Sequence, residues 1–138
     1  STGIQIIFQN NVPEGCPPML ASGVKFTQIL KNLVLNACQQ IRLHSLPVKK
    51  VAVSLNYESL DPRLPIKITV LDTGPGVHRV DFEKVFMPLY TTREKGIGLG
   101  LFLCRQLATE IGGKVEIKSS YMLTGSEFQI SLPGEVKA

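Results

Sequence analysis

Apolar residues recur along residues 25–44 with the period of an α-helix. Their spacing follows i, i+3, i+4 and i+7 at Phe26, Ile29, Leu30, Leu33, Ala37, Cys38 and Ile41. Because proline cannot continue a helix, Pro47 predicts that this helix ends near His44. A second helix is predicted over residues 99–111, where Gly112-Gly113 follows apolar residues spaced four apart, Leu103, Leu107 and Ile111.

Short apolar or alternating stretches predict strands at residues 4–8, 51–55, 66–70, 115–117 and 128–132. A turn at Thr124-Gly125 would join the last two, and a short helical piece is expected at residues 82–86. Residues 10–23 and 90–95 are expected to be loops. The simplest packing of this order is an α/β two-layer sandwich, with about three helices on one face of a mixed, largely antiparallel sheet. One domain over residues 1–138 is expected.

The composition is that of a folded globular domain, since 43% of the residues are hydrophobic and 19% are charged. The net charge of +4 suits an anionic partner, but basic residues are scattered and only Lys49-Lys50 are adjacent. We therefore expect no nucleic-acid partner. No apolar run approaches the roughly 20 residues that span a bilayer. Cys16, Cys38 and Cys104 form no CxxC pair and are expected to be reduced.

Polar residues form a second stripe on the first predicted helix, at Gln28, Asn32, Asn36 and Gln39. Their spacing of three or four residues places them along one edge. One interpretation is an edge that faces solvent. The other is that Asn36 offers its amide oxygen to Mg²⁺, which prefers hard oxygen ligands and keeps several waters.

Asp72 ends an apolar strand and is followed by Thr73-Gly74-Pro75-Gly76. These residue types also favour an ordinary turn. A functional interpretation is that Asp72 is a buried acceptor for an adenine amino group, with glycines that let a flat ligand approach the backbone.

Glycines alternate in Gly96-Ile97-Gly98-Leu99-Gly100-Leu101, directly before the second predicted helix. Each weakens a regular element by about 0.5–1 kcal/mol, so a specific role is expected. Unpaired N–H groups at a helix start carry partial positive charge and bind phosphate well. No Gly-Lys-Ser/Thr follows, and the spacing differs from that of the dinucleotide fingerprint.

In this order, these segments resemble the catalytic ATP-binding domain of sensor histidine kinases. The resemblance covers nearly the whole chain. It rests on an asparagine box at residues 32–37, a first glycine box at 72–76, a phenylalanine box at 82–88, a second glycine box at 96–101 and a closing turn at Gly125-Ser126-Glu127-Phe128.

The resemblance implies a Bergerat-type fold, ATP and Mg²⁺ as cofactors, and an ATP-dependent protein histidine kinase activity. It implies that Asn36 holds the metal, that Asp72 binds the adenine amino group and that residues 88–96 form a lid. Arg93 is expected to act beside Asn36 on the phosphates, with Lys95 as the alternative cation. The residues expected to contact nucleotide are Asn32, Asn36, Asp72, Gly74, Gly76, Thr92, Arg93, Lys95, Gly96, Gly98, Leu99 and Gly100.

Two residues depart from the family pattern. Gln39 stands where many members carry Lys or Arg, and Ile97 stands where Thr or Ser is usual. Tyr90-Thr91-Thr92-Arg93 and the short lid resemble the nitrogen-regulation-type subgroup. A serine-kinase anti-sigma factor and a non-catalytic nucleotide-binding module remain alternatives, whereas a chaperone-type or topoisomerase-type ATPase is disfavoured.

The implied partners are a helical-hairpin dimerisation domain that carries the phosphoacceptor histidine and a downstream response regulator. Neither His44 nor His78 lies in the sequence context of a phosphoacceptor. The chain begins Ser1-Thr2-Gly3, as expected of a domain excised from a longer protein. We expect it to be cytoplasmic and monomeric by itself, although its parent could be membrane-anchored.

Overall fold

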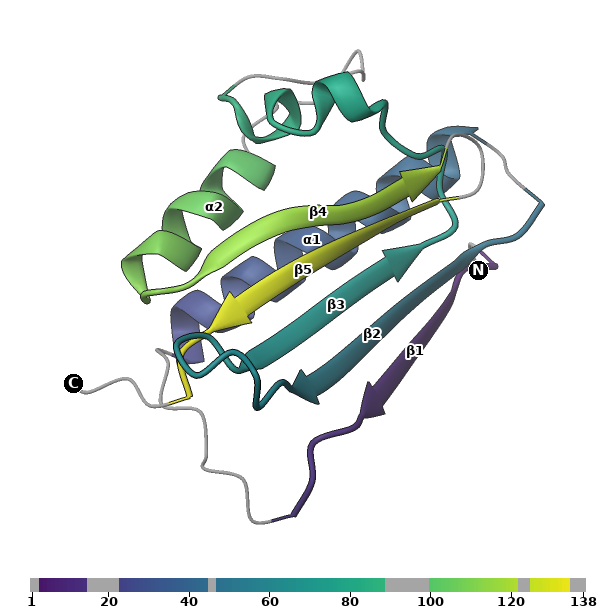
Figure 1. The fold of residues 1–138 in the computed structure, drawn as a ribbon. Coiled ribbons are helices and arrows are strands. Elements are labelled where there is room, and N and C mark those ends of the chain that lie inside the picture. Colours follow the sequence, from purple (N-terminus) through teal and green to yellow (C-terminus); the bar gives the residue numbers. More distant parts are fainter. Residues whose placement is uncertain (1–2, 15–22, 45–46, 89–99, 122–124, 135–138) are drawn as a thin grey trace.

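The computed structural model describes residues 3–14, 23–44, 47–88, 100–121 and 125–134. Helices lie along one face of a five-stranded sheet (Figure 1), which confirms the predicted two-layer α/β architecture. The elements in chain order are β1 (Gln5–Asn10), α1 (Gly23–His44), β2 (Lys50–Tyr57), β3 (Ile66–Asp72), the 3-10 turns η1 (Arg79–Asp81) and η2 (Lys84–Phe86), α2 (Gly100–Glu110), β4 (Lys114–Tyr121) and β5 (Gly125–Leu132).

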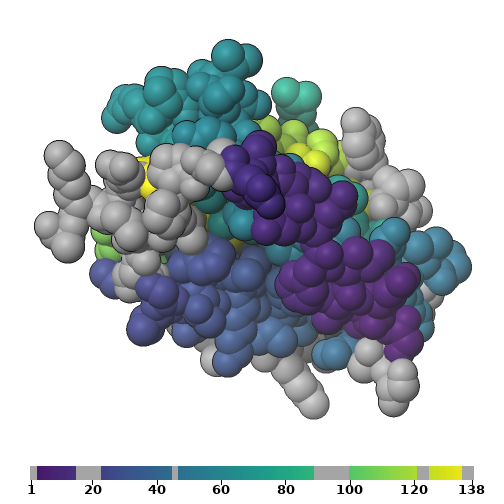
Figure 2. Space-filling view, turned by 90° about the horizontal axis from the view of Figure 1, so that it is seen from below, coloured from purple at the N-terminus to yellow at the C-terminus, as the bar shows by residue number. Residues whose placement is uncertain are grey.

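The strands are ordered β1-β2-β3-β5-β4. β1 runs parallel to β2, and the other neighbours are antiparallel, so the sheet is mixed as predicted. β1 is an edge strand whose Phe8 side chain is 70% exposed. Figure 2 shows β1 in purple at the surface of the molecule.

The core lies between α1 and the sheet. The apolar stripe of α1 is buried at Ile29, Leu33, Ala37, Cys38 and Ile41, as its period predicted. The sheet contributes buried residues at alternate positions, which face the helix because successive strand side chains point to opposite faces. These include Val51, Val53, Ile66, Ile68, Val70, Val115, Phe128, Ile130 and Leu132.

α2 confirms the second predicted helix, but its buried face is not centred on the leucines. Cys104 and Ala108 are fully buried, whereas the Leu103 side chain is 42% exposed. Cys104 donates its thiol proton to the carbonyl oxygen of Ile29 in α1, with an Sγ–O distance of 3.5 Å. Small side chains allow two helices to approach closely, so α2 meets α1 through these residues and turns Leu103 outward.

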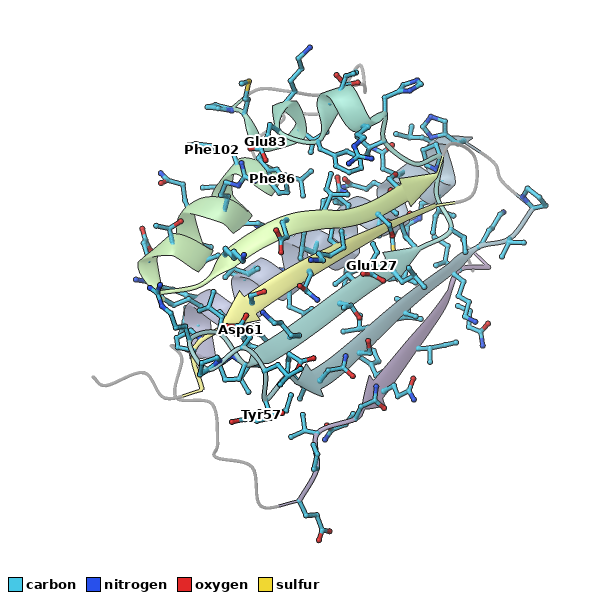
Figure 3. The ribbon with its side chains drawn as sticks, viewed as in Figure 1. Tyr57, Asp61, Glu83, Phe86, Phe102 and Glu127 are labelled. Carbon is cyan, nitrogen blue, oxygen red and sulfur yellow. The ribbon has the colours of Figure 1, made fainter. Side chains whose placement is uncertain are left out.

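The short helical piece predicted at residues 82–86 is present as the 3-10 turn η2, and a second 3-10 turn, η1, precedes it. Phe86 is buried and packs edge-on against Phe128, with ring centroids 6.1 Å apart. The guanidinium of Arg105 in α2 covers Phe86, 3.9 Å from the ring centroid. Figure 3 shows Glu83, Phe86 and Phe102 close together where η2 meets α2. Arg105 thus joins η2 to α2.

None of the helices in the described segments combines the length and the hydropathy that a bilayer crossing requires.

Candidate functional site

Asp72 is the one charged side chain buried in the core among the described residues, with 7% of its surface exposed. Its Oδ1 accepts a hydrogen bond from the backbone N–H of Gly74 at 2.8 Å, and the N–H of Ser126 also donates to the carboxylate. Burial raises the pKa of Asp72 to about 6, and both hydrogen bonds act in the opposite direction. At neutral pH the group is therefore mostly ionised, and it is an acceptor at the end of β3.

The turn after Asp72 is shaped by two glycines. A Cβ atom at Gly74 would lie only 2.8 Å from Oδ1 of Asp72, so glycine keeps the space beside the carboxylate open. Gly76 has a φ of 80°, in the left-handed region that favours glycine. The turn is anchored to β2 by Thr73, whose hydroxyl accepts from the N–H of Lys50 at 2.8 Å and donates to the carbonyl oxygen of Val48 at 2.9 Å.

Ser120 and Ser126 belong to this site, although sequence reasoning gave neither of them a role. Ser120 Oγ accepts the N–H of Val77 at 2.6 Å and lies 2.8 Å from Ser126 Oγ. Ser126 pairs directly with Asp72 across β5 and β3. The available signal was the position of Ser126 in the closing glycine turn. Nothing in the pattern of residues 115–121 indicated Ser120.

The polar edge of α1, which carries Asn32, Asn36 and Gln39, belongs to the helical layer that covers the sheet. Asn32 and Asn36 are both half-buried, and Gln39 is exposed. Gln28 Nε2 is 3.5 Å from the amide oxygen of Asn32. Burial raises the pKa of the Cys104 thiol to about 12, while a hydrogen bond from Asn32 acts in the opposite direction, so Asn32 reaches α2.

One helical turn after Asn36, α1 reaches the Asp72 turn. A Cβ at Gly74 would lie 3.6 Å from Cβ of Gln40. Four residues of helix rise about 6 Å, so Asn36 lies one helical turn before Gln40 and is one turn further from the carboxylate than Gln40 is. This helix therefore connects the predicted adenine end of the site with the predicted metal end.

Gly100 is the exposed first residue of α2, as the phosphate-binding interpretation requires of a helix start. The other predicted contacts in this region lie outside the described residues, namely Thr92, Arg93, Lys95, Gly96, Gly98 and Leu99. Among the described residues, the structure thus brings together Asp72, Gly74 and Gly76, with α1 beside them.

A family model described as histidine kinase-, DNA gyrase B-, and HSP90-like ATPase matches residues 21–136. The chain belongs to this ATPase family. The family assignment predicted from the motifs is therefore confirmed. It supports an ATP-binding catalytic domain of the histidine kinase type.

Relatives of this ATPase domain are sensor kinases. Sensor histidine kinase ZraS of Escherichia coli (strain K12) is 31% identical over 133 residues, which cover 96% of this chain and 26% of that protein. The sensory histidine kinase/phosphatase NtrB of Rhodobacter capsulatus is 30% identical over 138 residues, covering 95% of this chain and 38% of the relative. The chain therefore spans well under half the length of these curated relatives.

Solved structures show the same fold. Full-length ShkA in complex with AMPPNP superposes with a TM-score of 0.81 and 28% identity, covering 99% of this chain and 27% of that one. The catalytic domain of the histidine kinase ThkA gives a TM-score of 0.74 at 26% identity, covering 96% and 80% of the two chains. The ATPase domain therefore matches a histidine kinase catalytic domain over nearly its whole length.

Proposed function

We propose that this domain binds ATP with Mg²⁺ and supplies the γ-phosphoryl group for histidine autophosphorylation in a two-component signalling kinase. The observation that carries the proposal is the buried carboxylate of Asp72, held beside a turn in which Gly74 leaves room for a ligand. The AMPPNP complex of ShkA and the sensor-kinase names of the relatives support it.

The carboxylate is suited to the adenine end of ATP. Its two contacts are backbone N–H groups, and an ionised carboxylate has about four lone-pair positions, so acceptor capacity remains. Adenine presents an amino donor where guanine presents a carbonyl acceptor. Asp72 would therefore attract adenine and repel guanine.

The residues toward the phosphate end also suit the proposed cofactor. The half-buried Asn36 would offer an amide oxygen to Mg²⁺, a metal that keeps several waters and needs few protein ligands. When bound, Mg²⁺ neutralises charge on the phosphates. Asn32 would lie beside it, and the start of α2 at Gly100 would direct N–H groups to phosphate oxygens. Arg93, with Lys95 as the alternative, is proposed to add positive charge from the lid.

The phosphoacceptor is proposed to lie on a helical hairpin of the parent protein, and a response regulator would then receive the phosphoryl group. His44 and His78 are exposed, and His44 Nδ1 lies 2.9 Å from the carbonyl oxygen of Gln40 in its own helix. We expect the isolated domain to be monomeric, to bind nucleotide and not to phosphorylate itself. Because the substrate is intracellular ATP, we propose a cytoplasmic location.

Calorimetric titration with a non-hydrolysable ATP analogue, with and without Mg²⁺, tests the binding step. Asp72→Asn should weaken binding by roughly 10- to 100-fold, since it removes a charge-assisted hydrogen bond. Asn36→Ala should remove most of the Mg²⁺-dependent gain. Thr27→Ala, at an exposed position of the same helix, is the control and should keep both. Equal affinity for ATP and GTP analogues would contradict the proposal.

A phosphotransfer assay separates the kinase from a non-catalytic module. That alternative is favoured by Gln39, an exposed amide on α1 where the family pattern has a cation. Purified domain, radiolabelled ATP and a separately supplied histidine hairpin should give acid-labile phosphate on the hairpin. Binding without transfer would support the module, and acid-stable phosphate on a serine partner would support an anti-sigma kinase.

A further inference from the structure

The face of the sheet that meets the helices changes from apolar to polar in its last cross-strand row. Phe128 in β5 pairs with Val70 in β3 and with Ile117 in β4. In the next row toward the end of β3, Ser126 takes the place of Phe128 and pairs with Asp72 and Ser120. Side chains directly opposite each other across a sheet point to the same face, so three polar groups meet here.

A β-bulge brings Ser120 into this row. Regular alternation from Val115 and Ile117 would turn Ser119 toward the helices. Instead, the register shifts between Ile117 and Ser119, so that Ser119 pairs with Glu127 and Ser120 pairs with Ser126. An extra residue in one strand reverses the faces of the residues that follow. Ser119 therefore shares the opposite face of the sheet with Glu127, which Figure 3 labels.

The hydroxyl of Ser120 uses its full hydrogen-bonding capacity. It accepts the N–H of Val77 at 2.6 Å, it is 3.3 Å from the carbonyl oxygen of Gly125 and it is 2.8 Å from Ser126 Oγ. A serine hydroxyl has one donor and two acceptor positions. Donation to Gly125, with acceptance from Val77 and the Ser126 hydroxyl, satisfies all three.

We infer that Ser120 is a positioning residue for adenine recognition. Its contacts complete a closed path, because Val77 ends the turn that begins at Asp72 and the N–H of Ser126 donates to the Asp72 carboxylate. Ser120 thereby holds Val77 and Ser126, which lie on the two sides of the space beside that carboxylate. It does not occupy the acceptor positions of the carboxylate itself. The inference rests on the proposed nucleotide-binding function of Asp72.

Binding measurements on serine variants test this role. Ser120→Ala should raise the dissociation constant for a non-hydrolysable ATP analogue roughly 3- to 10-fold, as expected for one lost hydrogen bond. Adenosine should lose affinity by the same factor, because the hydroxyl acts on the base and not on the phosphates. Ser119→Ala, one residue away on the other face, is the matched control and should bind like the unmodified chain. Ser120→Thr keeps the hydroxyl and should recover most of the affinity.

Hydrogen exchange at the Val77 amide gives a reading that needs no nucleotide. The protection of this amide from exchange should fall in Ser120→Ala and persist in Ser119→Ala. Urea denaturation should show that the two variants have equal free energies of unfolding. Full affinity in Ser120→Ala, an equal loss in Ser119→Ala, or unchanged Val77 protection would overturn the inference. If the unmodified chain failed to bind adenine nucleotides, the proposed function would fail, while the exchange result would still report on the contact.

Discussion

The main chain of Gly125 lies so close to Asp72 that no side chain fits between them. A Cβ atom at Gly125 would lie 1.9 Å from the carbonyl oxygen of Asp72, and its φ of 133° is rarely adopted by residues with a side chain. Because β5 begins at this glycine, the start of β5 lies in close contact with the end of β3. The close approach also sets Ser126 opposite the carboxylate.

Replacing this glycine should damage stability and binding together. Gly125→Ala adds a backbone clash and an unfavourable φ, so we expect the free energy of unfolding to fall by roughly 2–4 kcal/mol. Urea denaturation measures this loss, and titration should show weaker nucleotide binding in the fraction that remains folded. Gly23→Ala is the control, since nothing lies within 4 Å of a Cβ there. A Gly125→Ala variant as stable as Gly23→Ala would contradict the geometry.

Adenine binding should weaken as the pH falls through the pKa of Asp72. Burial raises that pKa to about 6, so the carboxylate is mostly ionised at pH 7 and mostly protonated at pH 5. If only the ionised form accepts the adenine amino group, affinity should be roughly 10-fold lower at pH 5 than at pH 7. Adenosine is the suitable ligand, because it has no phosphate that titrates in this window. A flat profile between these pH values would show that Asp72 does not carry recognition.

The same carboxylate should destabilise the ligand-free domain at neutral pH. Its folded pKa lies above the ordinary value of 3.8, so its contribution to stability is full below about pH 4 and is lost as the pH rises through 6. Asp72→Asn should therefore raise the free energy of unfolding at pH 7.5, by at most about 3 kcal/mol, and the gain should vanish near pH 4.

Asp61 provides a contrast of opposite sign for the Asp72 experiment. A hydrogen bond from Lys67 lowers the pKa of Asp61, so its contribution is present above the ordinary value and is lost as the pH falls. Asp61→Asn should accordingly reduce stability at neutral pH and lose its effect in acid. Urea denaturation of both variants across pH 2–7.5 checks the two signs. Parallel profiles for the two aspartates would refute the assigned burial effect.

The sequence predicted burial best where it follows from the regular spacing of apolar residues within one helix or strand. The α1 stripe from Ile29 to Ile41 was predictable because a helix that covers a sheet needs one continuous apolar face. A buried carboxylate at the end of β3 was also predictable, because Asp72 continues the alternation that turns Ile66, Ile68 and Val70 into the core.

Other features depend on contacts between elements, which the spacing of residues within one element does not reveal. The inward position of Ser120 arises from the bulge after Ile117, which shifts the faces of a strand without changing its composition. The outward position of Leu103 arises because Cys104 and Ala108 let α2 approach α1, a choice made by packing between two helices. Neither could be inferred from residue spacing within a single element.

Arg105 should stabilise the junction of η2 and α2 mainly through the ring it covers and only slightly through its ion pair. Its Nη1 lies 2.8 Å from Oε2 of Glu83, but 78% of the Glu83 side chain is exposed, and such pairs contribute roughly 0–1 kcal/mol. The guanidinium also lies 3.9 Å from the centroid of the buried Phe86 ring, a contact that adds cation–π attraction and covers apolar surface. Glu83→Gln should thus change the free energy of unfolding by less than about 0.5 kcal/mol, whereas Arg105→Ala should cost about 1 kcal/mol or more.

Urea denaturation at low and high salt separates the two effects, because salt screens the ion pair and leaves the ring contact largely intact. If both variants lost the same stability, and the loss disappeared in high salt, the ion pair would be the main contribution.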